Sequence, residues 1–143
     1  MGVYLIDTNV ISEARKADAA HPGVRAFFRR CADQDIRLYL SVVTIGELRR
    51  GVELIRHRGD NAQADRLEAW LAVIVDDYRD AVLPIDSDTA QAWGRLRVPH
   101  PENALDKQIA ATALIHDLTL VTRNTQDFAA TGVSLLNPFA STT

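Results

Sequence analysis

Five short apolar segments alternate with longer amphipathic segments along this chain of 143 residues, and this alternation constrains the fold more than any other feature. Short apolar runs bounded by polar residues are typical of strands, and apolar residues that recur every three or four positions are typical of helices. Strands separated by helices form parallel sheets, because a parallel connection must cross one face of the sheet. We therefore predict an α/β fold with a central, mostly parallel sheet flanked by helices. The predicted strands are residues 3–6, 37–41, 81–85, 119–122 and 133–136.

The helical segments are separated by clear turn signals. The polar, Gly-containing stretch 57–61 separates two amphipathic segments, which we expect to pack as a helical hairpin. The Pro-rich stretch 98–103 must interrupt any helix, because each proline forces the preceding residue out of helical geometry. The predicted helices are one that starts at Thr44, one that starts near Asn61, one from Asp86 or Ser87 to Arg97, and a buried one across 104–117.

Composition limits the class of protein. No repeat or linker interrupts the pattern, and a hydrophobic share of 47% is enough for a buried core, so we expect a single domain over residues 1–140. The single Cys31 excludes an internal disulfide, and neither a leader nor a long apolar run is present, which predicts a cytoplasmic protein without a membrane contact. A net charge of -3 argues against a basic coat for nucleic acid, although a local basic face remains possible.

Acidic side chains fall where the strands of such a sheet would end. In parallel α/β sheets, ligands bind beyond the carboxyl ends of the strands. Asp7 follows the first strand, Glu47 lies near the start of the helix after the second, and Asp106 lies in the first turns of the helix that leads into the fourth. Asn124 and Asp127 follow that fourth strand. We expect all five side chains to gather at one edge of the sheet.

Carboxylates gathered without lysine or arginine partners repel one another, and a divalent cation removes that cost. Mg²⁺ and Mn²⁺ prefer oxygen ligands and keep several waters, so a few Asp and Glu side chains suffice to bind them. The four histidines show no ligand spacing, which argues against zinc. The sequence also lacks a GxSxG elbow and the common nucleotide-binding loops. We therefore predict an Mg²⁺ or Mn²⁺ site.

At this point the motifs resemble those of PIN-domain ribonucleases, in particular VapC-type toxins of bacterial toxin–antitoxin pairs. The matching segments are "LIDTNVISE" at 5–13, "LSVVTIGELRRGV" at 40–52, "ALDKQIAATAL" at 104–114, "LVTRNTQDF" at 120–128 and "LLNPF" at 135–139. The resemblance covers essentially the whole chain in the right order. It implies that Asp7, Glu47 and Asp106 are catalytic and bind the metal. For the fourth position it leaves two candidates: Asn124, which stands where relatives carry Asp, and Asp127, which lies three residues further on.

The resemblance also implies an activity and partners. It implies an endoribonuclease in which a metal-activated water attacks an RNA phosphodiester, a small antitoxin protein that blocks the site, and a homodimer. Thr8, Asn9 and Thr122 are candidates for orienting water or a carboxylate, and Arg123 is a candidate for holding phosphate. Further arginines that could hold phosphate are Arg49, Arg50, Arg56 and Arg58, although a solvated helix face explains the last two better.

Two expectations remain open at the level of sequence. Lys107 and Gln108 stand where relatives are often apolar, and we expect the start of their helix to be more solvated here. The alternative function is a catalytically silent PIN-like scaffold that binds RNA or a protein, although the presence of all three core acids argues against it. A receiver domain would need a lysine after a strand, and a DxD phosphatase would need an acid where Asn9 stands, so both are weaker.

Overall fold

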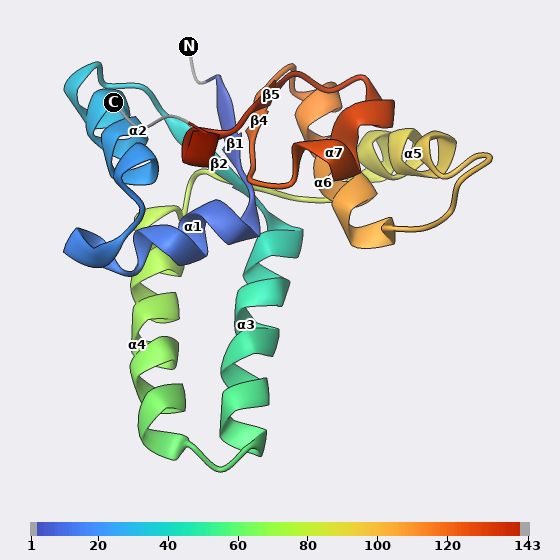
Figure 1. The fold of residues 1–143 in the computed structure, drawn as a ribbon. Helices are drawn as coiled ribbons and strands as arrows, with labels where there is room; N and C mark the ends of the chain where they lie inside the picture. Colours follow the sequence, from blue (N-terminus) through green and yellow to red (C-terminus); the bar gives the residue numbers. More distant parts are fainter. Residues whose placement is uncertain (1–2, 141–143) are drawn as a thin grey trace.

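A computed structural model describes residues 3–140, which form one five-stranded sheet with helices on both faces (Figure 1). The strands are β1 (Tyr4–Ile6), β2 (Leu38–Ser41), β3 (Val82–Leu83), β4 (Thr119–Val121) and β5 (Leu135–Leu136). They lie in the order β3-β2-β1-β4-β5, and every pairing is parallel. The α/β class, the five predicted strands and the parallel sheet are therefore confirmed.

Four helices follow the predicted pattern, with small differences at their ends, whereas the helices over residues 8–14 and 22–33 were not predicted. α3 begins two residues before Thr44, because the Ser41 hydroxyl accepts a hydrogen bond from the Val43 backbone N–H at 3.1 Å and caps the helix. α3 and α4 form the predicted hairpin, which projects from the sheet as the long arm in Figure 1. The helices are α1 (Thr8–Ala14), α2 (Pro22–Asp33), α3 (Val42–His57), α4 (Asn61–Asp77), α5 (Ser87–Leu96), α6 (Ala104–Ile115) and α7 (Thr125–Phe128), with 3₁₀ turns at Ala17–Ala19, Ala129–Thr131 and Pro138–Ala140.

The sheet buries both of its faces, and the sequence of β1 shows how. Successive side chains of a strand point to opposite faces, so Leu5 and Ile6 enter different cores. Ile6 packs in the cluster that includes Phe27 of α2, and Leu5 packs in the cluster that includes Ile109 of α6. Burial on both faces explains why the strands are continuous apolar runs rather than alternating ones.

Lys107 departs from the sequence-based expectation. We expected a solvated start of α6, but Lys107 is only 8% exposed. Its ammonium group donates a hydrogen bond to the backbone carbonyl of His100, in the loop that precedes the helix. The expectation is therefore wrong for Lys107, because the long side chain folds under that loop instead of extending into water.

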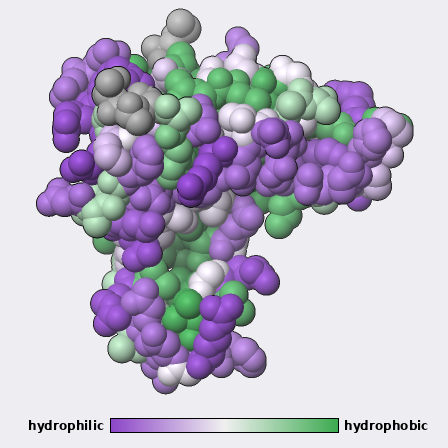
Figure 2. Space-filling view, in the orientation of Figure 1, coloured by the Kyte–Doolittle hydropathy of each residue, from purple (hydrophilic) through white to green (hydrophobic). Residues whose placement is uncertain are grey.

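The visible surface is mostly hydrophilic, but apolar side chains gather in several places (Figure 2). Figure 2 shows apolar side chains gathered between the two arms of the α3–α4 hairpin. A groove of about 280 Å³ lies there, and its apolar lining includes Leu48, Val52, Leu67 and Trp70. Within residues 3–140, no helix is both long and apolar enough to span a lipid bilayer.

Candidate active site

The predicted acids follow strands that end at the same edge of the sheet. Asp7 comes directly after β1, and Glu47 lies in the second turn of α3, the helix that follows β2. Asp106 lies in the first turn of α6, which runs back to the start of β4. Since parallel strands share one carboxyl edge, segments distant in sequence converge there.

Asp7 is the most enclosed of these acids, with only 4% of its surface exposed. Its carboxylate accepts hydrogen bonds from the Thr122 hydroxyl at 2.7 Å, the Thr8 backbone N–H at 2.8 Å and the Asn9 side-chain amide at 3.3 Å. Burial raises the pKa of Asp7, the bonds from Thr122 and Thr8 lower it in part, and the negative charge of Glu47 raises it further. The structure thus holds Asp7 in a fixed orientation while disfavouring its charge.

Thr8 links Asp7 to Glu47, because its backbone N–H donates to the first and its hydroxyl to the second. The Thr8 hydroxyl donates to a Glu47 carboxylate oxygen at 2.7 Å, and its own oxygen lies 3.1 Å from the hydroxyl of Thr44. Thr44 is fully buried and lies three residues before Glu47, on the same face of α3. Sequence reasoning used Thr44 only as a helix boundary, although its spacing from Glu47 was the signal that could have identified it.

Asp106 is half-buried, and its surroundings disfavour its charge. Burial, and then the negative charges of Asp7, Asp127 and Glu47, raises the pKa of Asp106 to about 6. Among residues 3–140, neither lysine nor arginine forms an ion pair with any of these four acids. The four carboxylates therefore repel one another, and no lysine or arginine of residues 3–140 forms an ion pair that would offset this repulsion.

Asp127 and Asn124, the two candidates for the fourth metal ligand, differ in whether they add negative charge near Asp7 and Asp106. Residues 125–128 form the helical turn α7, which carries Asp127 in its first turn and buries Phe128. The charge of Asp127 raises the pKa of both Asp7 and Asp106, so its carboxylate lies within electrostatic reach of them. Asn124 is exposed, and its backbone N–H donates to the Thr122 hydroxyl at 3.0 Å.

Arg123 borders the site through its backbone, but its side chain turns away. Its backbone N–H donates to the Asn9 side-chain oxygen at 3.2 Å, which orients Asn9. Its guanidinium group lies over the Phe139 ring, 4.6 Å from the centroid. The hydrogen bond from Lys16 is the main cause that lowers the pKa of Glu13, and the positive charge of Arg123 lowers it more weakly. Because Glu13 belongs to α1, the guanidinium group of Arg123 lies on the side of the site where α1 is.

The arginines of α3 are partly occupied by acids of α4. Arg56 pairs with Asp65 at 2.9 Å and with Glu68 at 2.6 Å, and Arg49 lies 3.6 Å from Glu68. These pairs cross the hairpin, and they support the interpretation of Arg56 as part of a solvated helix face. Arg50, one turn beyond Glu47, makes no ion pair within residues 3–140.

The donor chemistry of the site fits a hard divalent cation. It offers carboxylate oxygens on Asp7, Glu47, Asp106 and Asp127 together with the Asn124 amide oxygen, which are the ligand types that Mg²⁺ and Mn²⁺ prefer. As the side chains stand within residues 3–140, no three His, Cys, Asp or Glu side chains are close enough to hold one ion between them. Burial and the neighbouring negative charges raise the pKa of Asp7 and of Asp106, and a bound divalent cation would offset the repulsion among these carboxylates.

The family of the chain follows from comparison with known proteins. The family model for the PIN domain matches residues 4–133. The chain belongs to the PIN domain family. The resemblance inferred from the sequence motifs is thereby confirmed, and the match includes β1 to β4 and all of the acids discussed above, and it ends two residues before β5.

Individual PIN-domain relatives match over nearly their whole length. The chain is 35% identical to Toxin FitB from Neisseria gonorrhoeae over 143 residues, which cover 96% of this chain and 99% of FitB. It is 32% identical to VapC ribonuclease Y4jK from Sinorhizobium fredii over 144 residues, covering 96% and 98% of the two chains. The crystal structure of FitAcB from Neisseria gonorrhoeae superposes with a TM-score of 0.77 at 34% identity, covering 97% of this chain and 100% of that one.

Proposed function

We propose that this chain is a metal-dependent endoribonuclease and the toxin of a type II toxin–antitoxin pair. The observation that carries the proposal is that Asp7, Glu47 and Asp106 stand at one end of the parallel sheet, within electrostatic reach of one another. The relatives named toxin and VapC ribonuclease, which are similar over almost the whole chain, support the same activity. RNA and a small antitoxin are then the partners, and the cytoplasm is the compartment where both are present.

The residues of the site have distinct proposed roles. Mg²⁺ or Mn²⁺ bound by the acids would activate a water for attack on the RNA phosphodiester and would neutralise charge that develops on the phosphate. Thr122 and the Thr8 backbone hold the Asp7 carboxylate, and the Thr8 hydroxyl holds Glu47. These bonds fix the direction of the carboxylate oxygens, and such orientation strengthens metal binding.

We assign the fourth acidic position to Asp127 rather than Asn124. Asp127 brings a negative charge that reaches Asp7 and Asp106, whereas Asn124 can offer only a neutral carbonyl. The role of Asn124 in this proposal is to orient a metal-bound water or to close the turn after β4.

The groove of the α3–α4 hairpin is the proposed contact for the antitoxin. Its lining is apolar along α3 and α4 and includes Thr8 and Glu47 at one end. A chain bound along it would bury the apolar side chains and would reach the acids of the site, which explains how binding could block cleavage. A homodimer remains part of the proposal, and its measurement is the mass of the purified protein in solution.

Cleavage of RNA by the purified protein tests the enzymatic part of the proposal. We expect cleavage of total cellular RNA with Mg²⁺ or Mn²⁺, none in excess chelator, and a loss of several orders of magnitude in Asp7→Asn, which should stay folded. Asp18→Asn changes an exposed acid on the 3₁₀ turn after α1 and is the matched control. Full activity in Asp7→Asn would overturn the proposal, and RNA binding without cleavage would favour the silent scaffold.

Growth of a bacterial host tests the biological part. Expression of the chain alone should arrest growth, and co-expression of the small protein encoded beside it should restore growth through a tight complex. The Asp7→Asn variant is the control, because it keeps the groove and loses the acid. Equal arrest by that variant would show that any toxicity is not nucleolytic.

A further inference from the structure

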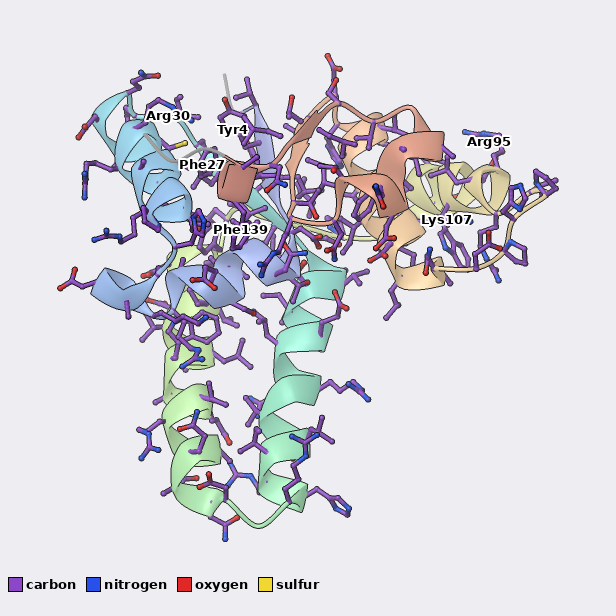
Figure 3. The ribbon with its side chains drawn as sticks, in the orientation of Figure 1. Tyr4, Phe27, Arg30, Arg95, Lys107 and Phe139 are labelled. Carbon is purple, nitrogen blue, oxygen red and sulfur yellow. The ribbon has the colours of Figure 1, made fainter. Side chains whose placement is uncertain are left out.

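Lys107 is a buried cation without an acidic partner. It is 8% exposed, and within residues 3–140 its ammonium group forms no ion pair. Burying a charge costs free energy unless strong hydrogen bonds replace the lost water. Its partner is the backbone carbonyl of His100, and Figure 3 places Lys107 between the start of α6 and the loop before it. The position therefore needs an explanation beyond packing.

The loop before α6 supplies an explanation for the burial of Lys107. Residues 98–103 contain Pro99 and Pro101, which have no backbone N–H, so the loop has few donors for its own carbonyl groups. Side chains on or next to the two flanking helices supply donors instead, to two loop carbonyl groups and to that of Ala104, the first residue of α6. The Trp93 indole N–H donates to the carbonyl of Ala104 at 3.0 Å, the Arg97 Nε donates to that of Pro101 at 3.4 Å, and the Lys107 Nζ donates to that of His100.

The same contacts define the start of α6. Asn103, the residue before the helix, has a left-handed backbone with φ of 57°, and its side chain makes no capping hydrogen bond. A helix start without a side-chain cap is less well defined, because its first N–H groups lack protein partners. Asp106 lies in this first turn, so the direction of its carboxylate depends on how the loop is held.

We propose that Lys107 is a positioning residue of the active site. By holding the His100 carbonyl, its ammonium group fixes the loop of residues 98–103 against α6 and thereby orients the carboxylate of Asp106. Its consequences for catalysis and for metal affinity rest on the proposed function, whereas its consequence for the loop does not. A small displacement of a catalytic group is enough to cost one to two orders of magnitude in rate.

The test compares Lys107→Met with wild type. Methionine keeps a long apolar side chain and removes the donor. We expect amide exchange in residues 100–106 to become at least about tenfold faster in the RNA-free protein, and Mn²⁺ affinity to fall about tenfold. With RNA, kcat should fall about tenfold while KM stays within about twofold, because the substrate contacts are unchanged. Lys107→Arg keeps a charged donor and should stay within about threefold of wild type.

The matched control is Lys16→Met, which removes the other lysine of the chain, an exposed residue paired with Glu13. It should change neither exchange in residues 100–106 nor Mn²⁺ affinity. A second measurement uses the Asp106→Asn background, where adding Lys107→Met should lower Mn²⁺ affinity no further if Lys107 acts through Asp106.

Three outcomes would overturn the inference: unchanged exchange and kcat in Lys107→Met, an equal loss of Mn²⁺ affinity with and without Asp106, or a Lys107→Met protein that does not fold while Lys107→Arg does. The last would assign Lys107 to the whole fold instead of to the position of Asp106. Faster exchange and weaker Mn²⁺ binding in a chain whose wild type cuts no RNA would uphold the inference and refute the proposed function.

Discussion

Replacing Asp106 by Asn should stabilise the metal-free protein while it removes the activity. Burial and the charges of Asp7, Asp127 and Glu47 raise the pKa of Asp106 from an ordinary 3.8 to about 6. At about 1.4 kcal/mol for each tenfold change, that rise corresponds to about 3 kcal/mol against the ionised carboxylate. Because the group is only half-buried and solvent screens part of this cost, we expect Asp106→Asn to add about 1 to 2 kcal/mol to the free energy of unfolding at pH 7.5.

The pH dependence gives the sign of the effect. Folded protein binds a proton at Asp106 more tightly than the unfolded chain does, so this contribution to stability is full below pH 3.8 and is lost as the pH rises through about 6. The advantage of Asp106→Asn should therefore be smaller at pH 5 than at pH 7.5. Urea unfolding in chelator at the two pH values measures this difference.

A control variant tests whether the stability change in Asp106→Asn is specific to the site. Asp18→Asn, which changes an exposed acid outside the site, should stay within about 0.5 kcal/mol of wild type at both pH values. If Asp106→Asn were less stable than wild type at pH 7.5, or if its advantage did not change with pH, the argument that mutual repulsion destabilises the metal-free site would be wrong.

Three further predictions concern the site and the core. Thr122→Val removes the 2.7 Å hydrogen bond to Asp7, and a hydrogen bond to a charged group contributes about 1.5–3 kcal/mol. The affinity for Mn²⁺, measured by calorimetry, should therefore fall about tenfold or more. Unchanged affinity would contradict this prediction. Asp127→Ala should weaken Mn²⁺ binding more than Asn124→Ala but less than Asp7→Ala, and the reverse order of the first two would assign the fourth position to Asn124. The Phe27 side chain is only 1% exposed, so Phe27→Ala leaves a cavity in the core and should lower the free energy of unfolding in urea by about 3–5 kcal/mol. A decrease below about 1 kcal/mol would mean that Phe27 does not anchor the core.

The fold was largely predictable because its signals are local. Apolar runs such as the one before Asp7 predicted strands, and the polar turn at 57–61 predicted the hairpin, since hydrophobic periodicity and turn residues act over a few positions. Helix ends were less certain. α3 starts earlier than predicted because the Ser41 hydroxyl caps it, and whether a serine after a strand caps the next helix depends on how the chain turns there.

The sequence predicted which residues make up the candidate site, but not its geometry. The rule that parallel strands share a carboxyl edge placed Asp7, Glu47 and Asp106 at one end of the sheet, and their roles in the site stay a prediction. Thr44 was missed as a member of the site, because a buried threonine in a helix is usually part of the core and only its contact with Thr8 distinguishes it. Lys107 was misplaced, because its burial depends on the carbonyl that a distant loop presents.

The sequence by itself determined the order and kind of the elements, and hence the parallel sheet and the edge at which acids follow its strands. Only the tertiary structure decided which groups touch. The hydrogen bond from Thr122 to Asp7 joins residues 115 positions apart, and the bond from Thr8 to Glu47 joins residues 39 apart. Such contacts, and the pKa values that follow from them, depend on packing across the whole sheet to within a few tenths of an ångström, and no local pattern of residue types carries that information.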